Sequence, residues 1–203
     1  MQPVPPALKR FIWDIQSMVE LADSEREILM IGRDLMVRLV AADDWLPAAF
    51  ATAEDAPFRQ FQLYADAMER FCVVATVIGA GQSLPLCREP VWDITGVLRG
   101  GLTRQAFALP EGAPPVAQGA ARLLTAGMVA TFSPAAGAAG LAMACPAGPG
   151  GAIAIQVHGG ELAGLERTTV DAEGRQGRFT TRYANPPEAP AYDILTIQTQ
   201  IVD

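Results

Sequence analysis

FCVVATVIGAGQSLPLCREPVWDITGVLRGGLTRQAFAL, residues 71–109, is the stretch of sequence that decides the fold. Two runs within it, 71–78 and 91–98, are rich in β-branched and aromatic residues, which is typical of buried β-strands. Arg99-Gly100-Gly101 follows the second run, and glycine readily takes the positive φ that a tight turn needs. The segment 103–109 is therefore predicted to pair with 91–98 as a β-hairpin.

Further short apolar runs follow this stretch at intervals typical of an antiparallel sheet protein. The chain also contains 19 glycines and 16 prolines, a high share for a helical bundle and an ordinary one for a loop-rich β protein. We therefore expect a mainly β sandwich or barrel. Its later strands are predicted at 127–132, 141–145, 152–158, 165–170 and 178–183, with a last one in DILTIQTQIV, residues 193–202.

The N-terminal part of the chain has a helical pattern instead. Apolar residues recur at steps of three and four through residues 5–50, as expected for helices with one buried face. Ser24 and Glu27 have the spacing of a capping box, in which each side chain satisfies a free backbone N–H at a helix start. We expect a helical segment, residues 1–57, packed on a β-barrel domain, residues 58–203.

Composition narrows the classes of function. The net charge of −7 and the lack of a basic stripe make nucleic-acid binding unexpected, because a phosphate backbone attracts cations. No apolar run approaches the length of a membrane span, and the N-terminus lacks the apolar core of a secretory signal, so we expect a cytoplasmic protein without a membrane partner. The three cysteines, Cys72, Cys87 and Cys145, have neither disulfide nor zinc spacing.

Several short motifs occur in the order and spacing of one known family. They are Tyr64 with Glu69-Arg70-Phe71, Gly79 with Gly81-Gln82, Pro85, Val91-Trp92, Gly96-x-Leu98-Arg99-Gly100, and AIAIQVHG at residues 152–159. In these motifs the chain resembles the bacterial thiol dioxygenases, the cupin group that contains cysteine dioxygenase and 3-mercaptopropionate dioxygenase. The resemblance covers residues 58–170 and implies a cupin-type double-stranded β-helix, or jelly-roll, barrel with N-terminal α-helices.

Enzymes of this family hold one Fe(II) with three histidines, whereas this chain has a single histidine, His158. Two of the family's ligands form His-x-His, since residues i and i+2 of a strand point to the same face. By the resemblance, the ligand positions fall on Cys87, Glu89 and Leu141. Leucine has no donor atom, so the usual iron site is not expected here.

The family's remaining site residues are also mostly replaced. Its Ser-His-Tyr triad, which tunes the bound thiol and oxygen, falls on Ala154, Gln156 and His158. Its arginine, which helps to hold the substrate carboxylate, falls on Arg167 and is kept. The chain therefore resembles a family whose chemistry it lacks the residues to perform, and we assign it no catalytic residue.

Two questions about these positions stay open in the sequence. Cys87, Glu89 and His158 can form a different site, for iron or zinc, if strand alternation turns His158 into the barrel. Otherwise Cys87 is a small buried residue, and Glu89 either pairs with an arginine, Arg88 or Arg167, or lies toward the mouth of the barrel. If Arg167 pairs with Glu89, the barrel is closed and structural; if Arg167 is free, it can bind a small anionic molecule.

Three functions are compatible with these patterns. The first is a thiol-dioxygenase-like cupin that has lost iron and activity, has no cofactor, and binds a small anionic ligand or serves as an interaction domain. The second is a metal-dependent oxidoreductase of the cysteine dioxygenase type with a Cys87/Glu89/His158 site. The third is a structural or assembly module whose N-terminal helices mediate self-association. The sequence leaves the oligomeric state undetermined.

Overall fold

The computed structural model describes residues 3–53, 56–137, 139–148 and 150–193. Two α-helices precede the β structure, and they are α1 (Pro6–Leu21) and α2 (Glu25–Leu39). Short 3-10 turns lie at Ala48–Phe50 and Pro134–Ala136. The strands are β1 (Phe58–Ala65), β2 (Cys72–Ile78), β3 (Cys87–Arg88), β4 (Asp93–Arg99), β5 (Gly101–Ala108), β6 (Val116–Thr125), β7 (Val129–Phe132), β8 (Gly140–Ala144), β9 (Ala152–His158), β10 (Glu166–Val170) and β11 (Gln176–Thr180).

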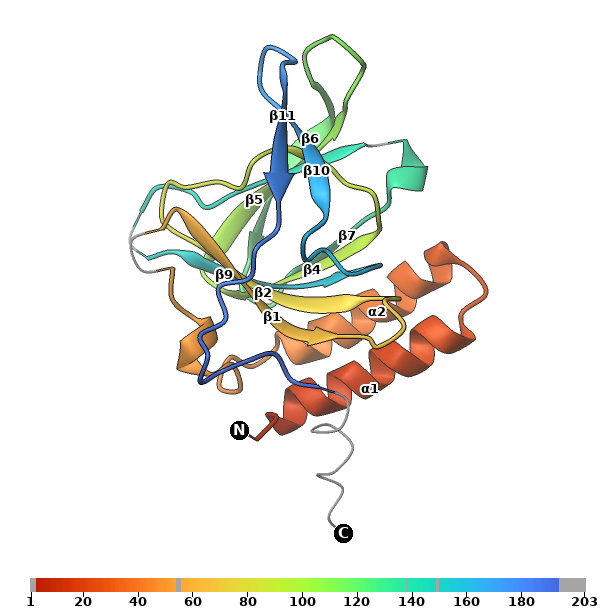
Figure 1. Ribbon diagram of the computed structural model, residues 1–203, viewed down its shortest axis with the longest axis vertical. Helices are drawn as coiled ribbons and strands as arrows, with labels where there is room; N and C mark the ends of the chain where they lie inside the picture. Colours follow the sequence, from red (N-terminus) through yellow and green to blue (C-terminus); the bar gives the residue numbers. More distant parts are fainter. Residues whose placement is uncertain (1–2, 54–55, 138, 149, 194–203) are drawn as a thin grey trace.

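The strands form two antiparallel sheets (Figure 1). Sheet A has the order β1-β2-β9-β4-β7, and sheet B has the order β11-β10-β3-β8-β5-β6. If the strands β2 to β9 are counted from 1 to 8, the sheets contain 1-8-3-6 and 2-7-4-5, which is the order of a jelly roll. The predicted fold class, a cupin-type double-stranded β-helix with N-terminal helices, is confirmed. The predicted last strand at 193–202 falls almost entirely outside the described residues.

The predicted hairpin between 91–98 and 103–109 is wrong. β4 pairs with β7 and β9 in sheet A, whereas β5 pairs with β6 and β8 in sheet B. Gly100 has a φ of 71°, so the chain does turn at the predicted glycine. A Cβ atom there would collide with the carbonyl oxygen of Gly151. The turn carries the chain from one sheet to the other, because consecutive strands of a jelly roll lie mostly in different sheets.

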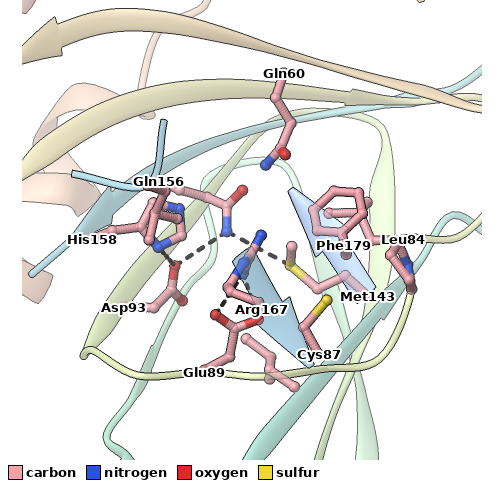
Figure 2. A pocket seen from close by; sticks show the side chains of 13 residues that line it. Gln60, Leu84, Cys87, Glu89, Asp93, Met143, Gln156, His158, Arg167 and Phe179 are labelled. Carbon is pink, nitrogen blue, oxygen red and sulfur yellow. Dashed lines mark hydrogen bonds and ion pairs between the residues drawn. The ribbon is translucent and has the colours of Figure 1, made fainter. Parts of the chain in front are cut away.

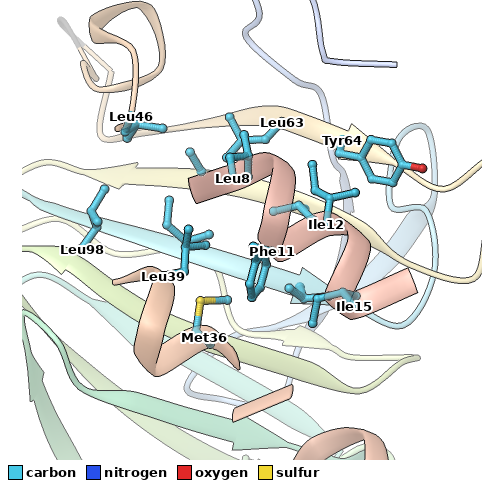
Figure 3. Close-up of a cluster of buried hydrophobic side chains, with 14 of the residues drawn as sticks. Leu8, Phe11, Ile12, Ile15, Met36, Leu39, Leu46, Leu63, Tyr64 and Leu98 are labelled. Carbon is cyan, nitrogen blue, oxygen red and sulfur yellow. The ribbon is translucent and has the colours of Figure 1, made fainter. Parts of the chain in front are cut away.

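The two helices pack along the outer face of sheet A (Figures 1 and 3). Ser24 Oγ accepts from the backbone N–H of Glu27 at 3.3 Å, and Glu27 Oε2 accepts from the N–H of Asp23 at 3.0 Å, so the predicted capping box forms. The helical run predicted for 5–50 is divided at these residues and ends at Leu39. Leu8, Ile12 and Ile15 of α1 are completely buried against the sheet. The boundary predicted at residue 57 stays a prediction. Among the described residues, no helix is long and apolar enough to cross a membrane.

Because the helices cover its outer face, the central strands of sheet A are buried on both faces. Ile153, Ile155 and Val157 of β9 belong to the cluster that the helices share with sheet A. The alternate residues of β9 point into the barrel, since successive side chains of a strand face opposite sides. This alternation places Gln156 and His158 inside the barrel.

Gly96 of β4 lies at a close contact between α2 and sheet A. A Cβ atom at Gly96 would lie 2.6 Å from Met36 Cγ and 2.8 Å from Val40 Cγ1. We expect Gly96→Ala to lower the free energy of unfolding by about 1–3 kcal/mol through overpacking, measured by urea denaturation. Gly101→Ala is the matched control, because the Cβ atom there would be 3.4 Å from the nearest atom. Equal stability of the two variants would contradict this description of the helix–sheet contact.

Candidate functional site

A small cavity lies inside the barrel, between the two sheets (Figure 2). Its volume is about 20 Å³, which is room for about one water molecule. Most of the positions singled out in the sequence line it, namely Cys87, Glu89, Leu141, Gln156, His158 and Arg167. Ala154 instead lies in the apolar cluster that fills the rest of the barrel.

Strand pairing explains why these positions meet. Cys87 of β3 is the direct partner of Leu141 on β8 and of Thr169 on β10. Glu89 continues this register, since its backbone N–H donates to the carbonyl of Ala139 at 2.9 Å. The structure therefore brings together the three positions that the resemblance assigns to metal ligands.

Arg167 is bound to Glu89, which answers one of the questions that the sequence left open. Arg167 Nη1 donates to Glu89 Oε2 at 2.7 Å and to Oε1 at 2.9 Å, and Nη2 donates to Thr181 Oγ1 at 2.9 Å. The guanidinium also lies 5.2 Å from the centre of the Phe179 ring. Burial raises the pKa of Glu89 above its ordinary value, although Arg167 opposes this effect. The arginine predicted to bind a ligand carboxylate thus has a carboxylate of the protein in that place.

Asp93 is the central polar residue of the site, and the sequence interpretation missed it. Its side chain is 3% exposed and forms an ion pair with Arg104, whose side chain is 6% exposed. Thr95 Oγ1 donates to Asp93 Oδ1 at 2.6 Å, and Gln156 Nε2 donates to Oδ2 at 3.1 Å. A buried carboxylate needs such partners. The alternation of residues along β4 could have identified Asp93, because Asp93, Thr95 and Val97 occupy one face of an otherwise apolar strand.

The network around Asp93 extends across four neighbouring strands of sheet A. Gln60 Nε2 of β1 donates to Thr76 Oγ1 of β2 at 3.3 Å, and that hydroxyl donates to Gln156 Oε1 of β9 at 2.6 Å. Gln156 then donates to Asp93 of β4. Gln156, to which the resemblance assigns the position of the triad histidine, joins two buried polar groups through hydrogen bonds.

His158 is a buried, neutral histidine. Its Nδ1 lies 3.5 Å from Asp93 Oδ2, and its Nε2 has no hydrogen-bond partner among the described residues. Burial lowers the pKa of His158 to about 4; Asp93 opposes this shift, whereas Arg167 and Arg104 add to it. At neutral pH the imidazole is therefore uncharged.

The side chains at the ligand positions do not fit an iron or zinc ion. Leu141 has no donor atom, and both oxygens of Glu89 accept from Arg167. Burial raises the pKa of the Cys87 thiol to about 11. Within the part of the chain that the structure describes, no three His, Cys, Asp or Glu side chains are grouped to hold a metal ion. This includes the alternative set Cys87, Glu89 and His158.

Several solved structures are distantly similar to this chain. No family profile matches the sequence. The cupin domain of an XRE-family transcriptional regulator from Enterobacter cloacae is 13% identical over 50% of this chain and 95% of that chain, with a TM-score of 0.39. An uncharacterized protein with a double-stranded β-helix domain from Klebsiella pneumoniae is 16% identical over 68% of this chain and 96% of that chain, with a TM-score of 0.42.

A protein of unknown function with a cupin-like fold from Ralstonia eutropha is 16% identical, over 62% of this chain and 66% of that chain, with a TM-score of 0.43. These similarities concern the fold alone, and the strand order already establishes it. The finer resemblance to thiol dioxygenases stays a prediction.

The Glu89–Arg167 pair generates a test of stability. Arg167→Met leaves the Glu89 carboxylate without its cation, and we expect the free energy of unfolding to fall by about 3–5 kcal/mol. Glu89→Leu/Arg167→Met leaves no unpaired charge and should be more stable than Arg167→Met alone. Arg178→Met, which breaks an exposed pair with Glu166, is the control and should change little. A double variant less stable than the single variant would show that the pair does not act as described.

The low pKa of His158 predicts a pH dependence of folding. In the unfolded chain this imidazole has its ordinary pKa of 6.5, so the unfolded state binds more protons between pH 6.5 and about 4. The stability contributed by neutral His158 is complete above pH 6.5 and is lost as the pH falls toward 4. We expect a loss of about 2 kcal/mol from pH 7 to pH 5, and a smaller loss in His158→Gln, measured by urea denaturation. Equal losses in both proteins would contradict the assignment.

Proposed function

We propose that the protein is a thiol-dioxygenase-like cupin that has lost the iron site and the oxygenase activity, and that its barrel binds a small anion outside the closed central cavity. The observation that carries this proposal is the Glu89–Arg167 ion pair, because it joins a replaced metal-ligand position to the retained substrate-binding arginine. In an active enzyme of that family, the residue at position 89 would face a metal and Arg167 would face a substrate. Here these two side chains form an ion pair with each other.

The charge balance of the interior supports the same proposal. Asp93 pairs with Arg104, Glu89 pairs with Arg167, and His158 is neutral. A divalent cation placed among these groups would lie close to two guanidinium groups and would have to compete for both carboxylates. Its binding would leave buried arginines without partners, at a cost of several kcal/mol each.

The oxidoreductase with a Cys87/Glu89/His158 metal centre remains the alternative function. It requires Glu89 to leave Arg167 and Cys87 to lose a proton against its raised pKa. No described contact favours that rearrangement, so we treat this function as the competing outcome of the test below.

A structural or assembly role, with the N-terminal helices in self-association, also stays a prediction. The outer face of the helices exposes Leu21 (79%), Met30 (62%), Ile31 and Val37. Because α1 and α2 bury their other faces against sheet A, deleting them would expose the core. Sizing chromatography of a Met30→Gln/Val37→Gln variant, which keeps the core, is the appropriate experiment for this role.

Metal content and oxygen uptake test the proposed function. For protein purified without chelator or affinity tag, we expect iron well below one equivalent. We also expect no oxygen uptake with cysteine or 3-mercaptopropionate in the presence of added Fe(II). One equivalent of iron that is lost in Cys87→Ala or Glu89→Ala would overturn the proposal and favour the alternative metal centre.

A further inference from the structure

A second pocket, separate from the central cavity, opens between the edge strands of the two sheets. It has a volume of about 130 Å³ and lies between β6, the last strand of sheet B, and β7, the last strand of sheet A. Its polar side chains are Arg104, Arg122, Gln118 and Thr131. All of its lining residues are described by the structure, and none of them is acidic. The pocket therefore presents two cations and no anion of its own.

The two arginines of this pocket are direct neighbours. Arg104 on β5 is the cross-strand partner of Arg122 on β6. Like charges in such a pair destabilise a sheet unless something neutralises them. Burial and, to a smaller extent, Arg122 lower the pKa of Arg104, while Asp93 and Glu89 act in the opposite direction.

The carboxylate of Asp93 balances only one of these two charges. Arg104 uses Nη2 for Asp93, and its buried Nε has no hydrogen-bond partner among the described residues. Arg122 forms no ion pair with any residue in the described part of the chain. One positive charge at the pocket is therefore left over.

The backbone at the pocket is irregular in a way that suits a binding site. Between the pairs Arg104–Arg122 and Ala106–Gln118 the register of β5 and β6 shifts, and Gly119 has a φ of 74°. Gln105 Nε2 donates to the carbonyls of Gln118 and Gly119, at 3.3 and 3.2 Å, so a side chain holds this bulge. Bulges of this kind are common beside binding sites, where they redirect side chains.

We propose that this pocket binds a small monocarboxylate with a short hydrocarbon tail. The guanidinium of Arg122 matches a carboxylate in shape and supplies the single excess charge. Phe132, Leu141 and three alanines provide an apolar wall for the tail. The volume is below the range of pockets for drug-sized ligands, so a small ligand fits it better than a nucleotide or a large cofactor.

This inference rests on the proposed function in one respect, because it takes the barrel to bind a small anion without oxidising it. It replaces the anion site expected at Arg167, whose guanidinium is occupied by Glu89. The two ideas can nevertheless fail separately. Iron and oxygen uptake decide the loss of oxygenase activity, whereas ligand binding through Arg122 decides the new site.

The test is calorimetric titration of the full chain with sodium butyrate at constant ionic strength. We expect saturable binding to the native protein and to Arg178→Gln, a matched loss of an exposed arginine. In Arg122→Gln the affinity should fall by about tenfold or more, the usual effect of losing a charge-assisted hydrogen bond. Ala120→Leu keeps both arginines but fills the pocket, so it should also lose binding while remaining folded.

Other probes separate the outcomes. Butyramide, which has the same shape without the charge, should bind more weakly than butyrate, and sodium chloride should not compete with butyrate except by screening. Absence of saturable butyrate binding to the native protein would overturn the proposal. Equal affinity in Arg122→Gln, or phosphate binding more tightly than butyrate, would overturn the assigned site or the assigned ligand class.

Discussion

The Asp93 carboxylate lies inside the barrel, and its neutralisation is the constraint on which the interior depends. An ionised carboxylate away from water costs several kcal/mol unless it is paired and hydrogen-bonded. Arg104 supplies the charge from sheet B, and Thr95 and Gln156 supply hydrogen bonds from sheet A. This group of contacts ties the two sheets together. The same requirement recurs at Glu89, which Arg167 and the neighbouring Thr181 stabilise.

The helices enlarge the apolar core on the other side of sheet A, and this apolar burial offsets the free-energy cost of the polar interior. Sheet A buries apolar residues of β2, β4 and β9 against α1 and α2 on its outer face. Its inner face then carries Thr76, Asp93, Gln156 and His158 on the alternate positions of the same strands. The two faces of sheet A differ because successive side chains of a strand point to opposite sides. One face packs on the helices, and the other lines the barrel.

The same scaffold thus presents two different chemical environments. In the central cavity the charges are balanced by pairs within the protein, and about one water molecule fits. In the pocket at the edge of the barrel, Arg104 and Arg122 leave one positive charge without a partner. We propose that the barrel binds its ligand at this edge pocket and not in the central cavity, because function depends on the site and not on the fold.

The sequence by itself determined the parts of the fold in which a local pattern has one physical meaning. The capping box at Ser24 and the apolar runs that became β2, β4 and β9 are of this kind. β6 gave no such signal, because nearly all of its residues are exposed and neither face has an apolar pattern. Gly100 correctly predicted a turn. It could not show whether the turn joins strands of one sheet or of two sheets, because both kinds of turn need a glycine.

Only the tertiary structure decided the chemistry of the site. The sequence allowed Arg167 to pair with Glu89 or to face a ligand, and the packing of β10 beside β3 selects the ion pair. The pattern of β4 does not reveal that Asp93 is the centre of the network, since Arg104 comes from the other sheet and Gln156 is 63 residues away in the chain. Electrostatic pairing depends on distances between strands, and those distances exist only after the two sheets have closed into a barrel.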